Sequence, residues 1–337
     1  MIVKFKENRV RRAYIGGARI DRFFGKPNPS DGRYPEEWLA SSVEAFNPDM
    51  PKAGEGISVT EEGVSFRDLL AQRGEMLLGK RDAKPSILVK LLDSSERLVI
   101  QCHPTVAFAK ERMNSPFGKT ECWYILDAEP GAYVYLGFKE GITREKWESL
   151  FFSQDVEGML ACLHKFPVKA GDLWFVAGGV PHAIGGGSFM VELQEPSDLM
   201  VIPERVTPSG VVLAEQKLHG GLGFDGMFDV YSYEGLSEQE TRTRYFRHPA
   251  PLPNTPVPLV DEALTDKFSM MRLCVSGASE IDLTEAYAVV VVTDGIGTLS
   301  AADERISLKK SDNFFVSANA GALSFEGNME LVLCIGR

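Results

Sequence analysis

The sequence predicts a mainly β protein made of two β-barrels, the first of which carries a small helical insertion. The 337 residues exceed the size of one ordinary core, which favours two domains or one large β domain with insertions. Short apolar segments recur between glycine- and proline-rich turns, a pattern that indicates a sandwich or barrel rather than alternating strands and helices. A segment that occurs twice in the chain supports two related barrels.

The repeated segment covers residues 169–177 and again residues 309–317. Both copies read Lys-x-x-Asp-x-x-Phe-Val, and both lie among short apolar segments of strand type. When the two copies are superposed in sequence, His182 corresponds to Ala322. We therefore expect two related barrels, of which only the first kept a histidine.

The individual elements follow from local signals. The turn-rich N-terminal region contains one helix, predicted over residues 65–72, which Ser65 caps and Gly74 ends. Apolar runs bounded by turn residues then predict six strands, at residues 87–92, 98–103, 122–126, 132–136, 173–176 and 189–194.

Two stretches predict the helical insertions of the first domain. Between residues 143 and 163 the apolar residues recur with helical spacing, and Thr143 is a suitable N-cap. A second, mixed stretch covers residues 214–227. The proline-rich segment 249–258 then marks a boundary, so we expect a first domain over residues 1–248 and a second over 249–337.

Composition limits the classes of partner. With 36 Lys and Arg against 47 Asp and Glu, the net charge of -11 repels nucleic acids and anionic membranes, although a few converging cations could still bind a small anion. No apolar run is long enough to cross a bilayer, and the first residues do not resemble a signal peptide. The five cysteines contain no CxxC pair, which argues against a disulfide framework or a Cys-rich zinc site. We expect a cytoplasmic protein.

Two of the five histidines lie near other possible metal ligands. His103 follows Gln101 by two residues in one predicted strand, so both side chains are expected on the same side of the sheet. Glu121 begins the next strand, and His182 lies in a glycine-rich turn that opens into another strand. Mixed nitrogen and oxygen donors suit a divalent metal such as zinc. The pattern predicts a metal site of Gln101, His103, Glu121 and His182.

A structural explanation of the same residues stays open at this point. A histidine at the end of a strand is commonly held by a hydrogen bond to the backbone, and Glu121 could simply pair with Lys119. We interpret His164 and His248 as surface residues.

Several motifs resemble one known family. The segment 171–182 resembles the second cupin motif, in which glycines and a metal-binding histidine recur at this spacing. More specifically, the chain resembles the type I mannose-6-phosphate isomerases in their short bacterial form. The resemblance runs from about Arg12 to about Asp198 and rests on residues 35–38 (PEEW), 98–104 (LVIQCHP), 118–124 (GKTECWY) and 180–185 (VPHAIG).

The resemblance implies two cupin jelly-roll barrels, the first catalytic and metal-binding, the second a degenerate cupin that binds no metal and supports the first. It also implies one zinc ion per chain, on the four ligands predicted above. Lys119 takes the place of the lysine beside the metal-binding glutamate, and Glu192 matches an acidic active-site position.

The sequence departs from the family at one position. The family usually has an arginine four residues after the aspartate that matches Asp198, and this chain has Ile202 there. The nearest arginine in the following residues is Arg205. We expect that Arg205 either reaches the cleft through a local rearrangement or leaves that cationic role unfilled.

The implied activity is that of a metal-dependent aldose–ketose isomerase, which interconverts mannose 6-phosphate and fructose 6-phosphate through a cis-enediol. Glu192 is the candidate base, while Lys119 and Arg205 are candidate cations for phosphate or enediolate oxygens. No nucleotide or redox cofactor is expected, since the chain has neither a GxxxxGK[ST] loop nor a GxGxxG strand–helix fingerprint. The expected partner is a small sugar phosphate, bound by a monomer or homodimer.

Two other functions remain open from the sequence. A cupin dioxygenase would bind iron through two histidines and a carboxylate, which His103, His182 and Glu121 could supply. Against it, Gln101 would add a fourth ligand where oxygen should bind. A non-catalytic sugar-binding or regulatory cupin is the second alternative. Metal analysis followed by isomerase assays separates the three functions.

Overall fold

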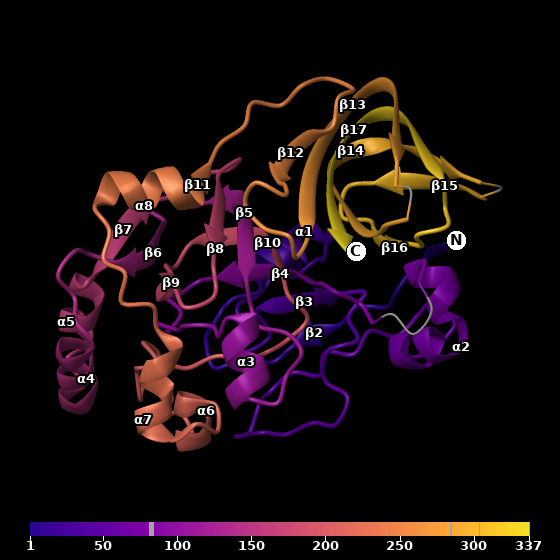
Figure 1. Ribbon diagram of the computed structural model, residues 1–337. Helices are drawn as coiled ribbons and strands as arrows, with labels where there is room; N and C mark the ends of the chain where they lie inside the picture. Colours follow the sequence, from indigo (N-terminus) through magenta and orange to yellow (C-terminus); the bar gives the residue numbers. More distant parts are fainter. Residues whose placement is uncertain (81–83, 284, 303, 337) are drawn as a thin grey trace.

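Sheets dominate the computed structural model, which describes residues 1–80, 84–283, 285–302 and 304–336 (Figure 1). The prediction of a mainly β protein is thereby confirmed. In the part of the chain that is described, no helix has the length and apolarity needed to span a membrane.

The sheet that carries most candidate site residues lies in the N-terminal two thirds of the chain. Its neighbouring strands are antiparallel where they pair, and the order is β11 (Phe246–Arg247), β8 (Leu173–Val176), β5 (Glu121–Ala128), β10 (Ser188–Gln194), β4 (Leu88–Ser94), β3 (Glu36–Leu39) and β2 (Arg9–Val10). A second, smaller sheet has the order β7 (Leu163–Pro167), β6 (Tyr133–Phe138) and β9 (His182–Ile184).

The third sheet is formed mainly by the C-terminal part of the chain. Its order is β1 (Ile2–Val3), β16 (Asn313–Val316), β14 (Tyr287–Ala301), β17 (Ala322–Gly336), β13 (Ser269–Asp282) and β12 (Val257–Val260), with β15 (Glu304–Lys309) paired to β14. The first strand thus crosses the domain boundary expected at residue 248. A two-residue strand has no periodicity of its own, so only the pairing with β16 reveals its place.

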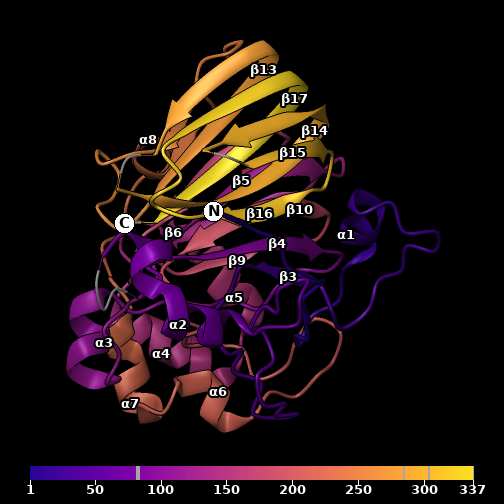
Figure 2. The same cartoon turned by 90° about the vertical axis from the view of Figure 1, so that its right-hand side faces the viewer.

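Helices lie mainly beside and below the sheets (Figures 1 and 2). They are α1 (Ala18–Phe23), α2 (Phe66–Leu78), α3 (Val106–Arg112), α4 (Arg144–Ser153), α5 (Val156–Ala161), α6 (Glu215–His219), α7 (Gly223–Met227), the 3-10 helix η1 (Phe228–Val230) and α8 (Glu238–Tyr245).

Two of the predicted helix caps are confirmed. The Ser65 hydroxyl accepts the backbone N–H of Asp68, and the Thr143 hydroxyl accepts that of Lys146. The N-terminal region has a second, unpredicted helix, α1, and α2 is longer than predicted. Helix α2 is kinked at Arg73, continues past Gly74 and is capped by Gly79, whose φ of 76° is the left-handed conformation that glycine adopts without strain.

One predicted strand, residues 98–103, is not a regular strand. Gln101 pairs with His182 in an isolated bridge, and the next residue, Cys102, pairs with Val201. The segment therefore changes partner between neighbouring residues and does not extend one continuous ladder. Its apolar pattern came from burial, which irregular backbone can share with strands.

The repeated segment forms the same turn in both places. The Lys169 N–H donates to the Asp172 carboxylate at 3.0 Å, and the Lys309 N–H donates to that of Asp312 at 2.9 Å. Each turn leads directly into a strand, β8 and β16 respectively. The sequence repeat therefore reflects a repeated local structure.

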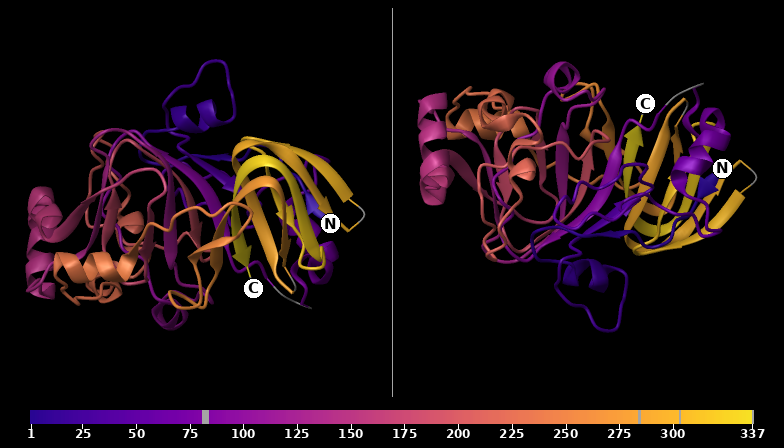
Figure 3. Two further views of the ribbon diagram at one scale, coloured as in Figure 1. Left: turned by 90° about the horizontal axis from the view of Figure 1, so that it is seen from above. Right: turned by 90° about the horizontal axis from the view of Figure 1, so that it is seen from below.

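The N-terminal sheet is buried on both faces, which explains its nearly continuous apolar strands. Along β10, Val191 and Leu193 point to one face, and they belong to one apolar core with Val289 and Val291 of β14. The views from the side and from above show the C-terminal sheet stacked against this face (Figures 2 and 3). The opposite face of β10, which includes Glu192, is left for the site.

Candidate metal centre and pocket

Three of the four predicted ligands converge at one buried point. Glu121 begins β5, His182 begins β9, and His103 follows the irregular segment that pairs with β9. Their candidate ligand atoms all lie within 4.8 Å of one another, and all three side chains are buried. The two imidazole rings have centroids 4.7 Å apart, which is compatible with one shared ion.

Both histidines present the same nitrogen to this point. Nδ1 of His103 lies 3.0 Å from the carbonyl oxygen of Leu199, and Nδ1 of His182 lies 2.9 Å from that of Val180. A carbonyl accepts, so each Nδ1 carries the proton and each Nε2 keeps its lone pair. Nε2 of His182 is buried and makes no hydrogen bond within the described residues.

The surroundings of the cluster favour the protonation states that bind a cation. Burial and the nearby Lys119 together lower the pKa of His103 to about 3, and burial also lowers the pKa of His182. Burial alone would raise the pKa of Glu121, but Lys119 and His103 hold it well below its usual range. Neutral imidazoles beside a carboxylate are the protonation states that bind a divalent metal.

Lys119 lies directly at the cluster. Its Nζ is 2.9 Å from Nε2 of His103 and 3.2 Å from Oε2 of Glu121. The contact that the sequence offered as a structural alternative, Glu121 with Lys119, is therefore present together with the cluster. Gln101 lines the same pocket as Glu121 and Lys119, and its backbone pairs with His182.

Glu192 lies in a row of side chains that crosses the sheet. Its cross-strand partners are Trp123 on β5 and Lys90 on β4, and Lys90 in turn pairs with Trp38 on β3. Nζ of Lys90 lies 3.2 Å from Oε1 of Glu192. Burial raises the pKa of Glu192 to about 7, although Lys90 acts in the opposite direction.

A network of buried ions continues from Lys90 toward the N-terminal segment. The guanidinium of Arg12 contacts Glu36 at 3.0 Å and binds both carboxylate oxygens of Asp198, at 3.0 and 3.1 Å. Glu36 also accepts hydrogen bonds from Tyr14 and Trp38. These bonds use both oxygens of each carboxylate, which fixes the network in one arrangement.

Glu121 of the cluster and the ion network line one pocket. Much of the remaining wall comes from the segment that follows β10, through Asp198, Met200, Ile202, Thr207, Leu213 and Lys217. The cavity volume is about 60 Å³. Ligand pockets usually have volumes of about 300–1,000 Å³, whereas one water takes up about 30 Å³ of liquid. A sugar phosphate therefore fits only when part of this wall moves.

Arg205 does not line this pocket. Its guanidinium lies over the rings of Phe151 and Phe224, 5.0 and 5.2 Å from their centroids, and its backbone N–H donates to Gln154. The side chain is half-buried on the helical side of the molecule. Ile202 lines the pocket at the position where the family has its arginine. No arginine of residues 198–217 lines the pocket.

Several pocket residues were missed by the sequence analysis. Lys90 had a detectable signal, since a lysine interrupts the apolar run of residues 87–92. Arg12 and Lys217 had none, because neither interrupts an apolar run or belongs to a recognised motif. His164, expected at the surface, is buried and hydrogen-bonds through Nε2 to the carbonyl of Leu236.

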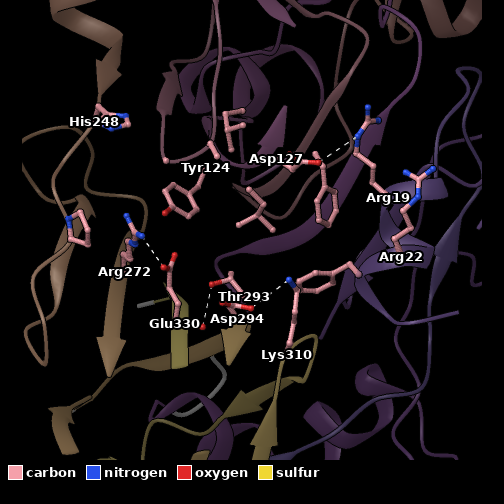
Figure 4. Close-up of a pocket in the computed structure, with 17 residues that line it drawn as sticks. Arg19, Arg22, Tyr124, Asp127, His248, Arg272, Thr293, Asp294, Lys310 and Glu330 are labelled. Carbon is pink, nitrogen blue, oxygen red and sulfur yellow. Dashed lines mark hydrogen bonds and ion pairs between the residues drawn. The ribbon is translucent and has the colours of Figure 1, made fainter. Parts of the chain in front are cut away.

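A wider cleft of about 690 Å³ lies between β5 and strands of the C-terminal sheet (Figure 4). Its charged side chains mostly pair with one another: Arg272 with Glu330 at 2.7 Å, Lys310 with Asp294 at 3.5 Å, and Arg19 with Asp127 at 3.9 Å. Among the described residues, Glu121 of the metal-type cluster lines the smaller pocket, and no residue of the cluster lines the wider cleft. We therefore take the smaller pocket as the candidate site.

Comparisons with known proteins show which family the chain resembles. Residues 262–335 match the family profile described as mannose-6-phosphate isomerase, cupin domain. A mannose-6-phosphate isomerase of Streptococcus mutans is 27% identical over 338 residues, which cover 97% of this chain and 96% of that protein.

Solved structures show the same fold. The mannose 6-phosphate isomerase of Bacillus subtilis superposes with a TM-score of 0.74 at 22% identity, covering 99% of both chains. A mannose 6-phosphate isomerase bound with zinc and yttrium superposes with a TM-score of 0.70 at 15% identity, covering 100% of this chain and 99% of that one. The predicted resemblance is confirmed, and along its whole length the chain is similar to mannose-6-phosphate isomerases of the cupin superfamily.

Proposed function

We propose that this protein is a metal-dependent aldose–ketose isomerase that interconverts mannose 6-phosphate and fructose 6-phosphate through a cis-enediol. The observation that carries the proposal is the convergence of His103, Glu121 and His182 beside the buried Glu192. One side of this arrangement suits a divalent cation, and the other offers a carboxylate that can exchange a proton. The similarity to isomerases along the whole chain supports the choice of reaction.

We propose Gln101, His103, Glu121 and His182 as the ligands of one zinc ion. The free Nε2 of His182 and the carbonyl contacts that fix both Nδ1 protons support this ligand set. A zinc ion held there supplies Lewis acidity, which makes the proton beside a carbonyl easier to remove. The zinc-bound structural relative supports zinc as the metal.

Glu192 is proposed as the base. Its ionised carboxylate takes the proton from carbon 2 of the open-chain aldose, and the resulting acid returns it to carbon 1, so the enzyme ends in its starting state. Removal of the proton forms the double bond between carbons 1 and 2, and the carbonyl electron pair moves onto the oxygen of carbon 1. The hydroxyl proton passes from the oxygen of carbon 2 to that of carbon 1, and the new carbonyl forms at carbon 2 as the proton returns to carbon 1. A pKa of about 7 suits this role, because both protonation states are then accessible near neutral pH.

Lys119 and Lys90 have different proposed roles. Lys119 lies against the ligand cluster, where its ammonium can donate to an enediolate oxygen and so stabilise the charge that develops there. Lys90 holds the carboxylate of Glu192 from the neighbouring strand. Lys90 is therefore a positioning residue and Lys119 a catalytic one.

The finer architecture also belongs to this proposal. We assign residues 1–248, except for β1, which joins the C-terminal sheet, to a catalytic cupin barrel with helical insertions at about 143–163 and 214–227, and residues 249–337 to a degenerate cupin barrel. The equal turns before β8 and β16 support their relationship. Ala322 begins β17 as His182 begins β9, and no histidine follows residue 248, which supports a second barrel without metal.

The test combines metal analysis with an assay. Purified protein is expected to contain one zinc per chain and to convert mannose 6-phosphate to fructose 6-phosphate, with loss of activity in chelator and recovery with zinc. Glu192→Gln should reduce kcat by roughly 10²- to 10⁴-fold, as expected for a general base, while the metal content is unchanged. Bound iron with oxygen consumption would instead support a dioxygenase. Sugar binding without turnover in metal-loaded protein would support a non-catalytic cupin.

A further inference from the structure

The first step concerns the cation expected beside Asp198. In the family that the sequence resembles, an arginine four residues after this aspartate is usual, and here Ile202 occupies that position. In this structure the carboxylate of Asp198 is nevertheless bound at both oxygens by the guanidinium of Arg12. A side chain from the N-terminal segment thus provides the positive charge that Ile202 does not.

The second step concerns Lys217, on the short helix α6. Its side chain lines the pocket and is 6% exposed. Among the described residues its ammonium forms no ion pair within 4 Å and no side-chain hydrogen bond, although Arg12 and Asp198 are among the charges that act on it. Burial and the nearby Arg12 lower the pKa of Lys217, and an anionic ligand beside it would favour its charged form.

The third step concerns the segments that supply the positively charged side chains of the pocket. Glu121 of the metal-type cluster and Lys119 line the pocket, and Arg12 and Lys217 line it from other segments of the chain. Arg12 uses one N–H of each terminal nitrogen for Asp198, so one further N–H on each remains for a ligand. Lys217 has its full donor capacity free. The two cations together form a receptor for an anion.

We infer that Lys217, with Arg12 as a second donor, binds the phosphate group of the substrate, in place of the arginine that is absent at position 202. This inference rests on the proposed function and adds to it the residues that select a phosphorylated sugar over a neutral one. Arg205 takes no part, because its guanidinium lies on the rings of Phe151 and Phe224 outside the pocket.

The experiment compares metal-loaded wild-type protein with Lys217→Met, Lys217→Arg and the control Lys110→Met. Lys110 is an exposed lysine on α3 that does not line the pocket, so its variant changes the net charge equally. Calorimetry measures the Kd for inorganic phosphate, and steady-state assays measure kcat and KM for mannose 6-phosphate and for unphosphorylated mannose. Metal content is matched in all samples.

Lys217→Met should weaken phosphate binding and raise KM for mannose 6-phosphate by roughly 10- to 100-fold, the loss expected for a hydrogen bond to a charged group. KM for unphosphorylated mannose, which has no phosphate group, should change less than KM for mannose 6-phosphate. Lys217→Arg should recover most of the phosphate affinity, and Lys110→Met should match the wild type.

Two outcomes separate this inference from the proposed function. If wild-type protein isomerises mannose 6-phosphate and Lys217→Met leaves both KM and the phosphate Kd unchanged, the inference is overturned while the function stands. If no sugar phosphate is isomerised but phosphate binds and Lys217→Met abolishes that binding, the function fails while the anion site stands. Should Lys217→Met not fold, Lys217→Arg is tested in its place. A phosphate Kd that Lys217→Arg weakens by the roughly 10- to 100-fold expected for loss of the charge then counts against the inference.

Discussion

The ammonium of Lys90 lies 3.2 Å from Oε1 of Glu192, and the two residues are direct cross-strand partners on β4 and β10. Both side chains are buried, so this contact is little screened by solvent. Burial and the nearby Glu121 favour the neutral form of Glu192, while Lys90 favours the ionised form. The pKa of the proposed base therefore reflects burial, opposed by this neighbour.

The first prediction concerns the pH dependence of activity. A base works only when ionised, so kcat/KM should fall as the pH drops below about 7, the pKa of Glu192. Lys90→Met removes the charge that lowers this pKa, and the acidic limb should then move to higher pH. A pH profile of kcat/KM checks this, with Lys165→Met as a control for net charge. If the acidic limb of the kcat/KM profile is at the same pH in Lys90→Met as in the wild type, Lys90 does not lower the pKa of Glu192.

The same pKa has a consequence for stability. The pKa of Glu192 is raised in the folded protein, so the folded state binds this proton more tightly than the unfolded state does. Protonated Glu192 therefore contributes to the free energy of unfolding. This contribution is complete below the ordinary pKa of a glutamate and is lost as the pH rises through about 7. Glu192→Gln, which stays neutral, should remove this part of the pH dependence of unfolding.

The second prediction separates the ligand histidines from the others. His182→Ala should lose the metal and the activity, because it removes a ligand whose Nε2 has no hydrogen bond among the described residues. His164→Ala is the matched control, since that buried histidine is held by the carbonyl of Leu236 on another part of the fold. Elemental analysis of both proteins checks this. Equal metal content in the two variants would exclude His182 as a ligand.

The third prediction concerns the stability of the buried network. Arg12→Ala leaves the carboxylates of Glu36 and Asp198 buried without their main partner, so we expect a loss of about 3–5 kcal/mol in the free energy of unfolding. Denaturant titration measures it. Arg305→Ala, which breaks an exposed pair with Glu326, should change the stability little. Similar values for both variants would show that burial does not strengthen the Arg12 contacts.

The fourth prediction concerns Arg205. Its guanidinium over two phenylalanine rings is worth about 0.5–1 kcal/mol in a half-buried setting, so Arg205→Ala should lower the stability by that order. The value of KM for mannose 6-phosphate should remain near that of the wild type. A fall in turnover by orders of magnitude would instead restore the catalytic role expected from the sequence.

The fifth prediction concerns entry to the pocket. The cavity of about 60 Å³ is closed partly by residues 199–217, in which Val206 and Val212 pair across a small exposed hairpin. This hairpin should open to admit the substrate and close over it. Hydrogen exchange of the amides of Thr207 and Leu213 should therefore slow when mannose 6-phosphate is present. Exchange that is unchanged at saturating substrate would place the entrance elsewhere.

The sequence by itself determined what depends on neighbouring residues. The caps at Ser65 and Thr143, most of the predicted strands and the turn of the repeat all follow from short-range patterns. The histidines of the cluster could be found because histidine is scarce and the motifs around them are distinctive.

Only the tertiary structure decided which distant charges meet. Arg12 reaches Asp198 across 186 positions of sequence, and Lys217 enters the pocket from a helix that no local pattern connects with it. Arg205, close to the site in sequence, lies instead on aromatic rings outside the pocket. The physical reason is that periodicity records which face of an element is buried. The partner that a buried charge meets depends on how separate segments pack, and charge alone does not encode that packing.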